Sequence, residues 1–96
     1  MAERLTRLRP LYAEGWNTLT AARIETRDLE GAVAAAEEAR RLAPYDATPL
    51  VNLGNVAYLR EDYAGARALW EEALGLDPGM LRAKAGLEYL DREGLE

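Results

Sequence analysis

The sequence predicts an all-α chain in which pairs of helices repeat along a solenoid. The first observation is a constant offset of 34 residues between the stretches 13–46 and 47–80, at which the same residue recurs in at least eight pairs of positions. The second is that apolar side chains in both stretches follow the i, i+3, i+4 spacing of amphipathic helices. Units of this kind bury their apolar faces only by stacking on one another. The recurring pairs include Asp28 and Asp62, Gly31 and Gly65, Ala32 and Ala66, Glu37 and Glu71, Glu38 and Glu72, Ala39 and Ala73, Leu42 and Leu76, and Pro44 and Pro78.

Composition narrows the class of protein. Ninety-six residues make one domain, and 12 basic against 17 acidic side chains give a net charge of −5. An acidic domain is a poor partner for nucleic acid, whose binding depends on clustered Lys and Arg. No stretch is long and apolar enough to span a bilayer, and no signal-peptide pattern follows the first residue, so we expect a cytoplasmic protein without membrane contact.

The sequence also argues against an enzyme. The chain lacks His, Cys and Ser, the usual general bases and nucleophiles. The acidic pairs Glu37-Glu38 and Glu71-Glu72 are adjacent in sequence, and adjacent helical residues do not face one another, so they predict a solvated face. No phosphate loop, calcium loop or metal-ligand spacing is present. We therefore expect no catalysis, no cofactor and no metal.

Residues 1–12 resemble the end of a unit whose beginning is missing. Leu8 and Pro10 lie 34 residues before Leu42 and Pro44. This match predicts a short helix over Glu3–Arg9 that Pro10 ends, because proline cannot continue a helix. The alternative is a frayed N-terminal tail.

The first full unit spans residues 13–46. Its first helix is predicted over Ala13–Thr26, with Trp16 and Leu19 on its apolar stripe. Asp28 is placed to cap the second helix, which is Ala-rich and predicted over Leu29–Leu42.

The second unit spans residues 47–80. Its helices are predicted over Ala47–Arg60, with Asp46 as a cap, and over Tyr63–Leu76, with Asp62 as a cap. Gly54 lies inside the first of these helices, where glycine costs about 1 kcal/mol relative to alanine. We therefore expect Gly54 to permit a close approach between helices. The fifth helix, over 80–93, has polar outer faces that are typical of a terminal capping helix.

These residues resemble the tetratricopeptide repeat, a 34-residue helix–turn–helix unit. Trp16 and Leu19 match the family's first-helix Trp and Leu, Leu53 and Gly54 its Leu-Gly pair, and Tyr63 its aromatic residue after the turn. The family's small residues and closing proline match Ala32, Ala39 and Pro44, and then Ala66, Ala73 and Pro78. The resemblance implies a right-handed solenoid in one domain, 1–96. It would hold a partial unit or N-terminal helix (1–12), repeats at 13–46 and 47–80, and a capping helix (81–96).

The chain departs from the family pattern at several positions. Thr20 replaces the expected glycine, and Ala36 occupies the position that Trp70 fills one unit later. These differences predict that one unit is thin where the other is bulky. Trp16 and Trp70 both fall at helical spacing among apolar residues, so we expect both to be buried in the core.

In this family the first helix of each unit lines a concave groove, so the resemblance implies that the groove-facing residues bind a peptide. Asn carboxamides both donate and accept hydrogen bonds, which suits an extended peptide backbone. Arg82 and Arg92 could pair with an acidic ligand group. Only Asn52 and Arg82 fit the basic clamp with which some relatives hold a C-terminal carboxylate, so binding of that type is not expected. The predicted groove residues are Asn17, Val51, Asn52, Asn55, Tyr58, Leu59, Arg82, Tyr89 and Arg92.

The resemblance therefore implies an adaptor or scaffold that binds a protein or peptide segment. The alternative is a self-assembly module whose array ends form a homodimer or a higher oligomer, since Leu5 and Leu8 have no complete unit to join. A nucleic-acid role for Arg4, Arg7 and Arg9 is weak, because three arginines supply few phosphate contacts.

Overall fold

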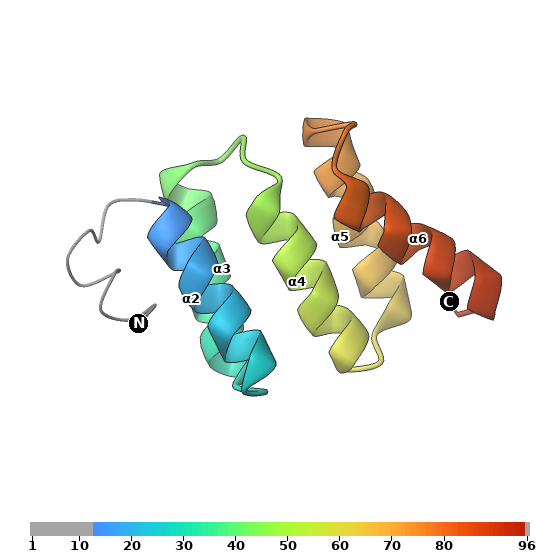
Figure 1. Ribbon diagram of the computed structural model, residues 1–96, viewed down its shortest axis with the longest axis horizontal. Helices are drawn as coiled ribbons and strands as arrows, with labels where there is room; N and C mark the ends of the chain where they lie inside the picture. The colour runs from blue at the N-terminus through green and yellow to red at the C-terminus, as the bar shows by residue number, and fades with distance from the viewer. Residues whose placement is uncertain (1–12, 96) are drawn as a thin grey trace.

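A computed structural model describes residues 13–95 of the chain, and within them every regular element is an α-helix. The helices are α2 (Ala13–Glu25), α3 (Leu29–Leu42), α4 (Thr48–Leu59), α5 (Tyr63–Leu76) and α6 (Leu81–Glu93), shown in Figure 1. The predicted all-α helix–turn–helix solenoid is confirmed. The short helix predicted over Glu3–Arg9 lies outside the described residues.

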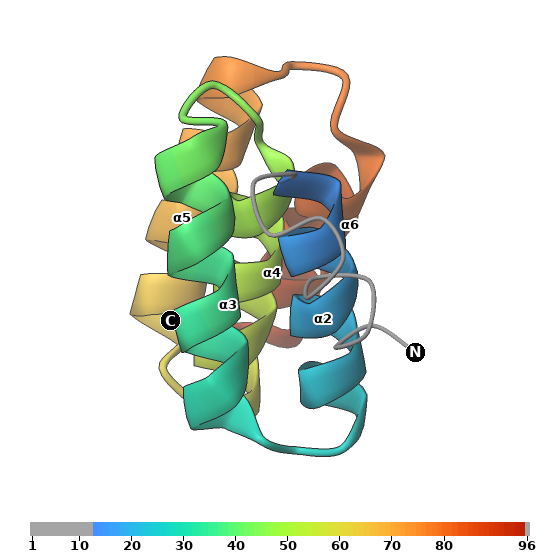
Figure 2. The same cartoon turned by 90° about the vertical axis from the view of Figure 1, so that its left-hand side faces the viewer.

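The helices form two layers. α2, α4 and α6 make one layer, and α3 and α5 make the other (Figures 1 and 2). Helix α3 packs against α2 and α4, and α5 packs against α4 and α6, so each hairpin stacks on the next. Helix α4 therefore has neighbours on several sides. None of the helices in residues 13–95 is long and apolar enough to cross a membrane.

Equivalent aspartates cap the second helix of each repeat. The Asp28 carboxylate accepts a hydrogen bond from the Gly31 backbone N–H at 3.1 Å, and Asp62 accepts one from Gly65 at 3.0 Å. Both caps satisfy an N–H that the first helical turn leaves unpaired. The sequence predicted both caps and the bounds of α3 and α5 correctly.

The start of α2 and the end of α6 also match the prediction, and the other helix ends differ from it by one residue. Helix α4 begins at Thr48, with Ala47 as its N-cap residue, instead of beginning at Ala47. Asp46 lies one position further out, and its carboxylate accepts a hydrogen bond from the Thr48 N–H at 3.0 Å. It therefore still pairs a free N–H at the start of this helix, although it does not occupy the N-cap position.

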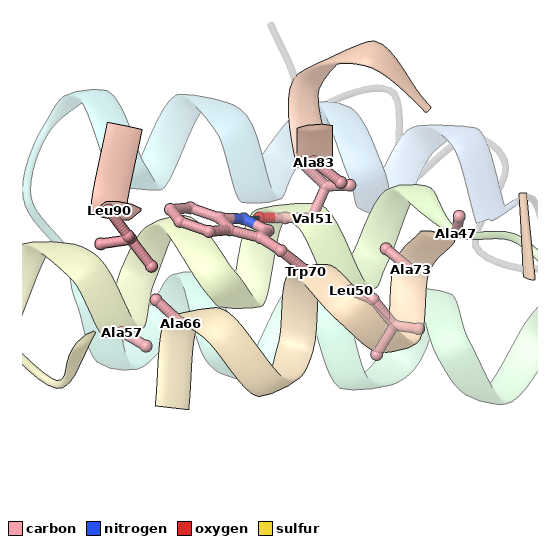
Figure 3. Packing of buried hydrophobic residues seen from close by; sticks show 9 residues of the cluster. All are labelled: Ala47, Leu50, Val51, Ala57, Ala66, Trp70, Ala73, Ala83 and Leu90. Carbon is pink, nitrogen blue, oxygen red and sulfur yellow. Dashed lines mark hydrogen bonds between the residues drawn. The ribbon is translucent and has the colours of Figure 1, made fainter. Parts of the chain in front are cut away.

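The main hydrophobic core joins α4, α5 and α6 around Trp70. The indole ring lies among the side chains of this cluster, and its Nε1–H donates to the Val51 carbonyl at 3.2 Å (Figure 3). Trp70 is only 4% exposed, as the helical spacing predicted. Trp16 was also predicted to be buried, but it is half-buried beside a smaller cluster of Leu19 and Ala35. The second repeat thus holds most of the core.

Gly54 of α4 lies against a large side chain of the neighbouring helix α5. A Cβ atom built on Gly54 would lie 2.4 Å from Nε1 of Trp70, and one built on Gly86 would lie 2.7 Å from its Cε3. Both distances are far below van der Waals contact. Gly54 therefore makes room for the indole ring of α5, and Gly86 of α6 makes room for the same ring.

Candidate functional site

An open groove lies between α4 and α6. It has a volume of about 440 Å³, within the range of ~300–1,000 Å³ that is common for ligand sites. Asn55, Tyr58 and Leu59 come from α4, Trp70 comes from α5, and Arg82, Ala85, Gly86 and Tyr89 come from α6.

Helical spacing explains how α6 supplies one wall of the groove. Arg82, Gly86 and Tyr89 follow one another at intervals of four and three residues, which places them on one face of the helix. The adjacent face of α6, about a quarter turn round the helix, carries Ala83 and Leu90, which are fully buried in the core. The core contacts thus fix the rotation of α6 that aims its other face into the groove.

The floor of the groove is the Trp70 ring. Because Gly86 has no side chain, the six-membered part of the indole reaches the groove lining on the α6 side. A larger residue at position 86 would cover or displace the ring. The indole nitrogen is satisfied inside the protein by Val51, so the ring offers the groove an apolar surface.

Aromatic rings form the wall at one end of the groove. The Tyr58 and Tyr89 ring centroids lie 5.9 Å apart with an interplanar angle of 78°, an edge-to-face arrangement. The Tyr58 ring also lies 5.6 Å from Tyr63 and 6.4 Å from Trp70. Hydrogen bonding with Tyr89, followed by desolvation, raises the pKa of Tyr58 to about 12.

The other end of the groove carries a positive charge. Arg82 is exposed, and one of its terminal nitrogens donates to Oδ1 of the buried Asn52 at 3.3 Å. A guanidinium has five N–H donors, so this single bond orients Arg82 and leaves donors for a ligand. Arg92, at the end of α6, lies over the Tyr89 ring, 5.7 Å from its centroid. It does not line the groove.

The structure brings five of the nine predicted groove residues together. These are Asn55, Tyr58, Leu59, Arg82 and Tyr89.

The placement of two other predicted residues was wrong. Val51 and Asn52 were expected on an open face, but they are only 1% and 2% exposed. Val51 belongs to the core, and Asn52 reaches the site only through its bond to Arg82. The reason is that α4 has helices packed on more than one side, so more of its surface is buried than one apolar stripe.

Asn17 lies away from this groove. Its Nδ2 donates to the Asp46 carboxylate at 3.2 Å, which ties α2 to the loop that precedes α4. This bond gives Asn17 a structural role at the joint between the two repeats.

The predicted set lacks three residues of the lining, Trp70, Ala85 and Gly86. Trp70 was correctly assigned to the core, but the pattern gave no sign that part of its ring faces outward. Gly86 could have been found, since it lies on the same helical face as Arg82 and Tyr89. Within residues 13–95, no three acidic side chains lie close enough together to hold a metal ion.

Comparison with known proteins agrees with this architecture. The sequence profile of the tetratricopeptide repeat family matches residues 47–80. The TPR domain of OM64 from Arabidopsis superimposes with a TM-score of 0.82 at 20% identity, over 95% of this chain and 75% of that one. MamA superimposes with a TM-score of 0.80 at 22% identity, over 98% of this chain and 56% of that one, so this chain spans little more than half of MamA. No curated protein sequence matches the chain.

Proposed function

Because residues 47–80 are a tetratricopeptide repeat within a domain of that fold, we propose that the chain is a protein-interaction module that binds a partner segment between α4 and α6. In this proposal the module acts as an adaptor or scaffold, without catalysis. The observation that supports it most directly is the groove itself. It combines apolar rings with a free carboxamide at Asn55 and a cation at Arg82, the mixture that peptide recognition uses.

The composition of the groove supports binding to a protein. Tyr, Trp and Arg are the residue types most enriched at energetically important positions of protein interfaces. Tyr58, Tyr89, Trp70 and Arg82 represent all three types within one lining. An open groove of this kind also exposes apolar rings that a partner would shield from water.

Site-specific photo-crosslinking tests the proposed face. A photoreactive phenylalanine analogue replaces Ala85, which is exposed in the groove, and in a matched protein it replaces Ala68, which is exposed on α5 outside the groove. In cells of the source organism, we expect a discrete partner adduct from position 85 and none from position 68. Equal adducts from both positions, or none from position 85, would contradict the proposal.

Substitutions in the groove provide the second test. Asn55→Ala and Tyr89→Ala remove partner contacts from partly exposed positions, so the helical circular dichroism signal should persist while the adduct at position 85 is lost. An undiminished adduct in both variants would remove these residues from the site.

Self-assembly stays a separate prediction. It depends on the apolar residues of the stretch 3–10, which lies outside the described residues. Sedimentation velocity at micromolar to millimolar concentration tests it, and a strict monomer over this range would rule it out.

A further inference from the structure

The charge of the groove differs in sign from the charge of the chain. The whole chain carries −5, yet the groove lining contains no carboxylate and one cationic side chain, Arg82. Helix α4, which forms one wall, has no charged residue at all. A partner that enters this groove therefore meets a local positive charge in a domain that is otherwise acidic.

Arg82 is held in place without a carboxylate partner. Asn52 Oδ1 accepts one of its N–H groups, and no described carboxylate forms an ion pair with it. Other arginines of α5 and α6 differ in this respect: Arg67 pairs with Asp91 at 2.7 Å, and Arg92 lies 3.9 Å from Glu93. Arg82 is thus positioned to bind a carboxylate from outside the described chain.

The neighbouring part of the groove suits a bulky apolar side chain. Tyr58 and Tyr89 stand nearly at right angles, and the Trp70 ring lies below them at Gly86. A side chain placed in this corner contacts ring surface on more than one side, an arrangement that stabilises aromatic and large aliphatic groups. Together with Leu59, these rings exclude water from the apolar group that enters.

The distance between Arg82 and the aromatic corner of the groove sets the spacing between the two groups of the ligand that would occupy them. Arg82 and Gly86 are four residues apart on α6, which corresponds to about 6 Å along the helix axis. In an extended segment, side chains two residues apart lie on the same face, separated by about 6.6 Å. Asn55 favours an extended segment over a helix, because an extended chain offers unpaired backbone groups to its carboxamide along its whole length, whereas a helix offers them only at its ends.

We infer that the groove recognises an extended segment that presents a bulky apolar side chain and a carboxylate two residues apart. The apolar side chain occupies the corner of Tyr58, Tyr89 and Trp70, and the carboxylate pairs with Arg82. This inference rests on the proposed function, since it specifies the ligand chemistry of the same groove. A helical partner with the two groups four residues apart is the competing outcome.

Two blocked peptides serve as probes, acetyl-Ala-Phe-Ala-Glu-Ala-amide and acetyl-Ala-Glu-Ala-Phe-Ala-amide, which cover both chain directions. Dissociation constants come from backbone amide chemical shifts of the labelled protein. We expect one peptide to shift the amides of Ala85 and Gly86. Glutamine in place of its glutamate should weaken binding about fivefold at low salt, the upper end for an exposed ion pair. Alanine in place of its phenylalanine should abolish the shifts.

Arg82→Gln identifies the protein side of the interaction. In this variant the glutamate and glutamine peptides should bind equally, whereas Lys84→Gln should keep the fivefold difference. Lys84 is a matched control because it is exposed on the same helix and outside the groove lining. The inference is overturned if neither peptide depends on its glutamate, if the dependence survives Arg82→Gln, or if only a helix-stabilised peptide binds.

These results separate the inference from the proposed function. A partner adduct at position 85 without a preference for the two peptides would overturn the ligand chemistry and leave the groove as the binding face. Peptide binding without any adduct at position 85 would contradict the adaptor role and leave the recognition chemistry intact.

Discussion

The second repeat fills the space between its helices with one large side chain. Trp70 extends from α5 against Gly54 of α4 and Gly86 of α6, and a Cβ atom at either glycine would collide with its ring. The bulk thus comes from α5, and both facing helices lack a side chain at the contact.

The first repeat distributes its volume the other way. One period before Trp70 stands Ala36, and the positions equivalent to the two glycines carry Thr20 and Asn52. All three are buried, with exposed fractions of 0%, 0% and 2%. Here Ala36 of α3 is the smallest of the three side chains, whereas Thr20 of α2 and Asn52 of α4 are larger.

This difference explains where the groove lies. Because protein interiors are closely packed, a large residue on one helix requires small ones opposite. Asn52 is buried, with 2% of its surface exposed, whereas Gly86 lets the edge of the largely buried Trp70 ring reach the groove between α4 and α6. The same repeat geometry therefore gives a closed contact on one side of α4 and an open groove on the other.

Trp70→Ala should have the largest effect on stability. We expect it to lower the free energy of unfolding by about 3–5 kcal/mol, because it empties the centre of the larger core. Urea unfolding followed by circular dichroism measures the loss. Trp16→Ala is the matched change in the first repeat and should cost clearly less, since Trp16 is half-buried. Equal losses would mean that the two repeats share the stability evenly.

Gly86→Ala should test whether the glycines make room for the ring. The added methyl group must displace Trp70, so we expect a loss of about 1–3 kcal/mol in the free energy of unfolding. Gly75→Ala on α5 is the control, because no atom lies within 4 Å of its added Cβ and alanine there should stabilise the helix by about 0.5–1 kcal/mol. If both variants are stabilised, close contact with the ring does not explain Gly86.

The caps should show where the two repeats are alike. Asp28→Ala and Asp62→Ala each remove one bond to a glycine N–H and should each cost about 1 kcal/mol in thermal or urea unfolding. The Asn variants keep an acceptor and should cost less. Asp28 also lies 3.6 Å from Arg23, but an exposed pair adds little. A cost twice as large at one cap would show that the motifs are not equivalent.

The smallest effect concerns pH. The helices of the first repeat contain no tyrosine, and its Tyr45 lies exposed in the loop after α3, whereas Tyr58 of the second repeat has a pKa raised to about 12. Between the ordinary pKa of about 10 and about 12 the folded state binds more protons than the unfolded state, so stability falls as pH rises through this window.

Carbon-13 NMR of the tyrosine Cζ atoms measures this titration. Tyr89→Phe should lower the pKa of Tyr58, because the hydrogen bond with Tyr89 is the largest cause of the shift. An unchanged midpoint in this variant would assign the shift to desolvation.

The sequence by itself determined the helices and their caps. The bounds of α3 and α5 and the bonds from Asp28 and Asp62 follow from interactions three or four residues apart, which a local pattern records completely. The 34-residue period also determined the order of stacking, because each unit needs a neighbour to bury its apolar face.

Only the tertiary structure decided which side of α4 is open. Helix α4 contains no charged residue, so no polar face distinguished the buried Val51 and Asn52 from Asn55 and Tyr58 in the groove. That choice depends on where α2, α3 and α5 press against it. The contribution of the Trp70 ring to the groove lining likewise depends on Gly86, a residue of another helix, and a contact between distant segments does not appear in the periodicity of the sequence.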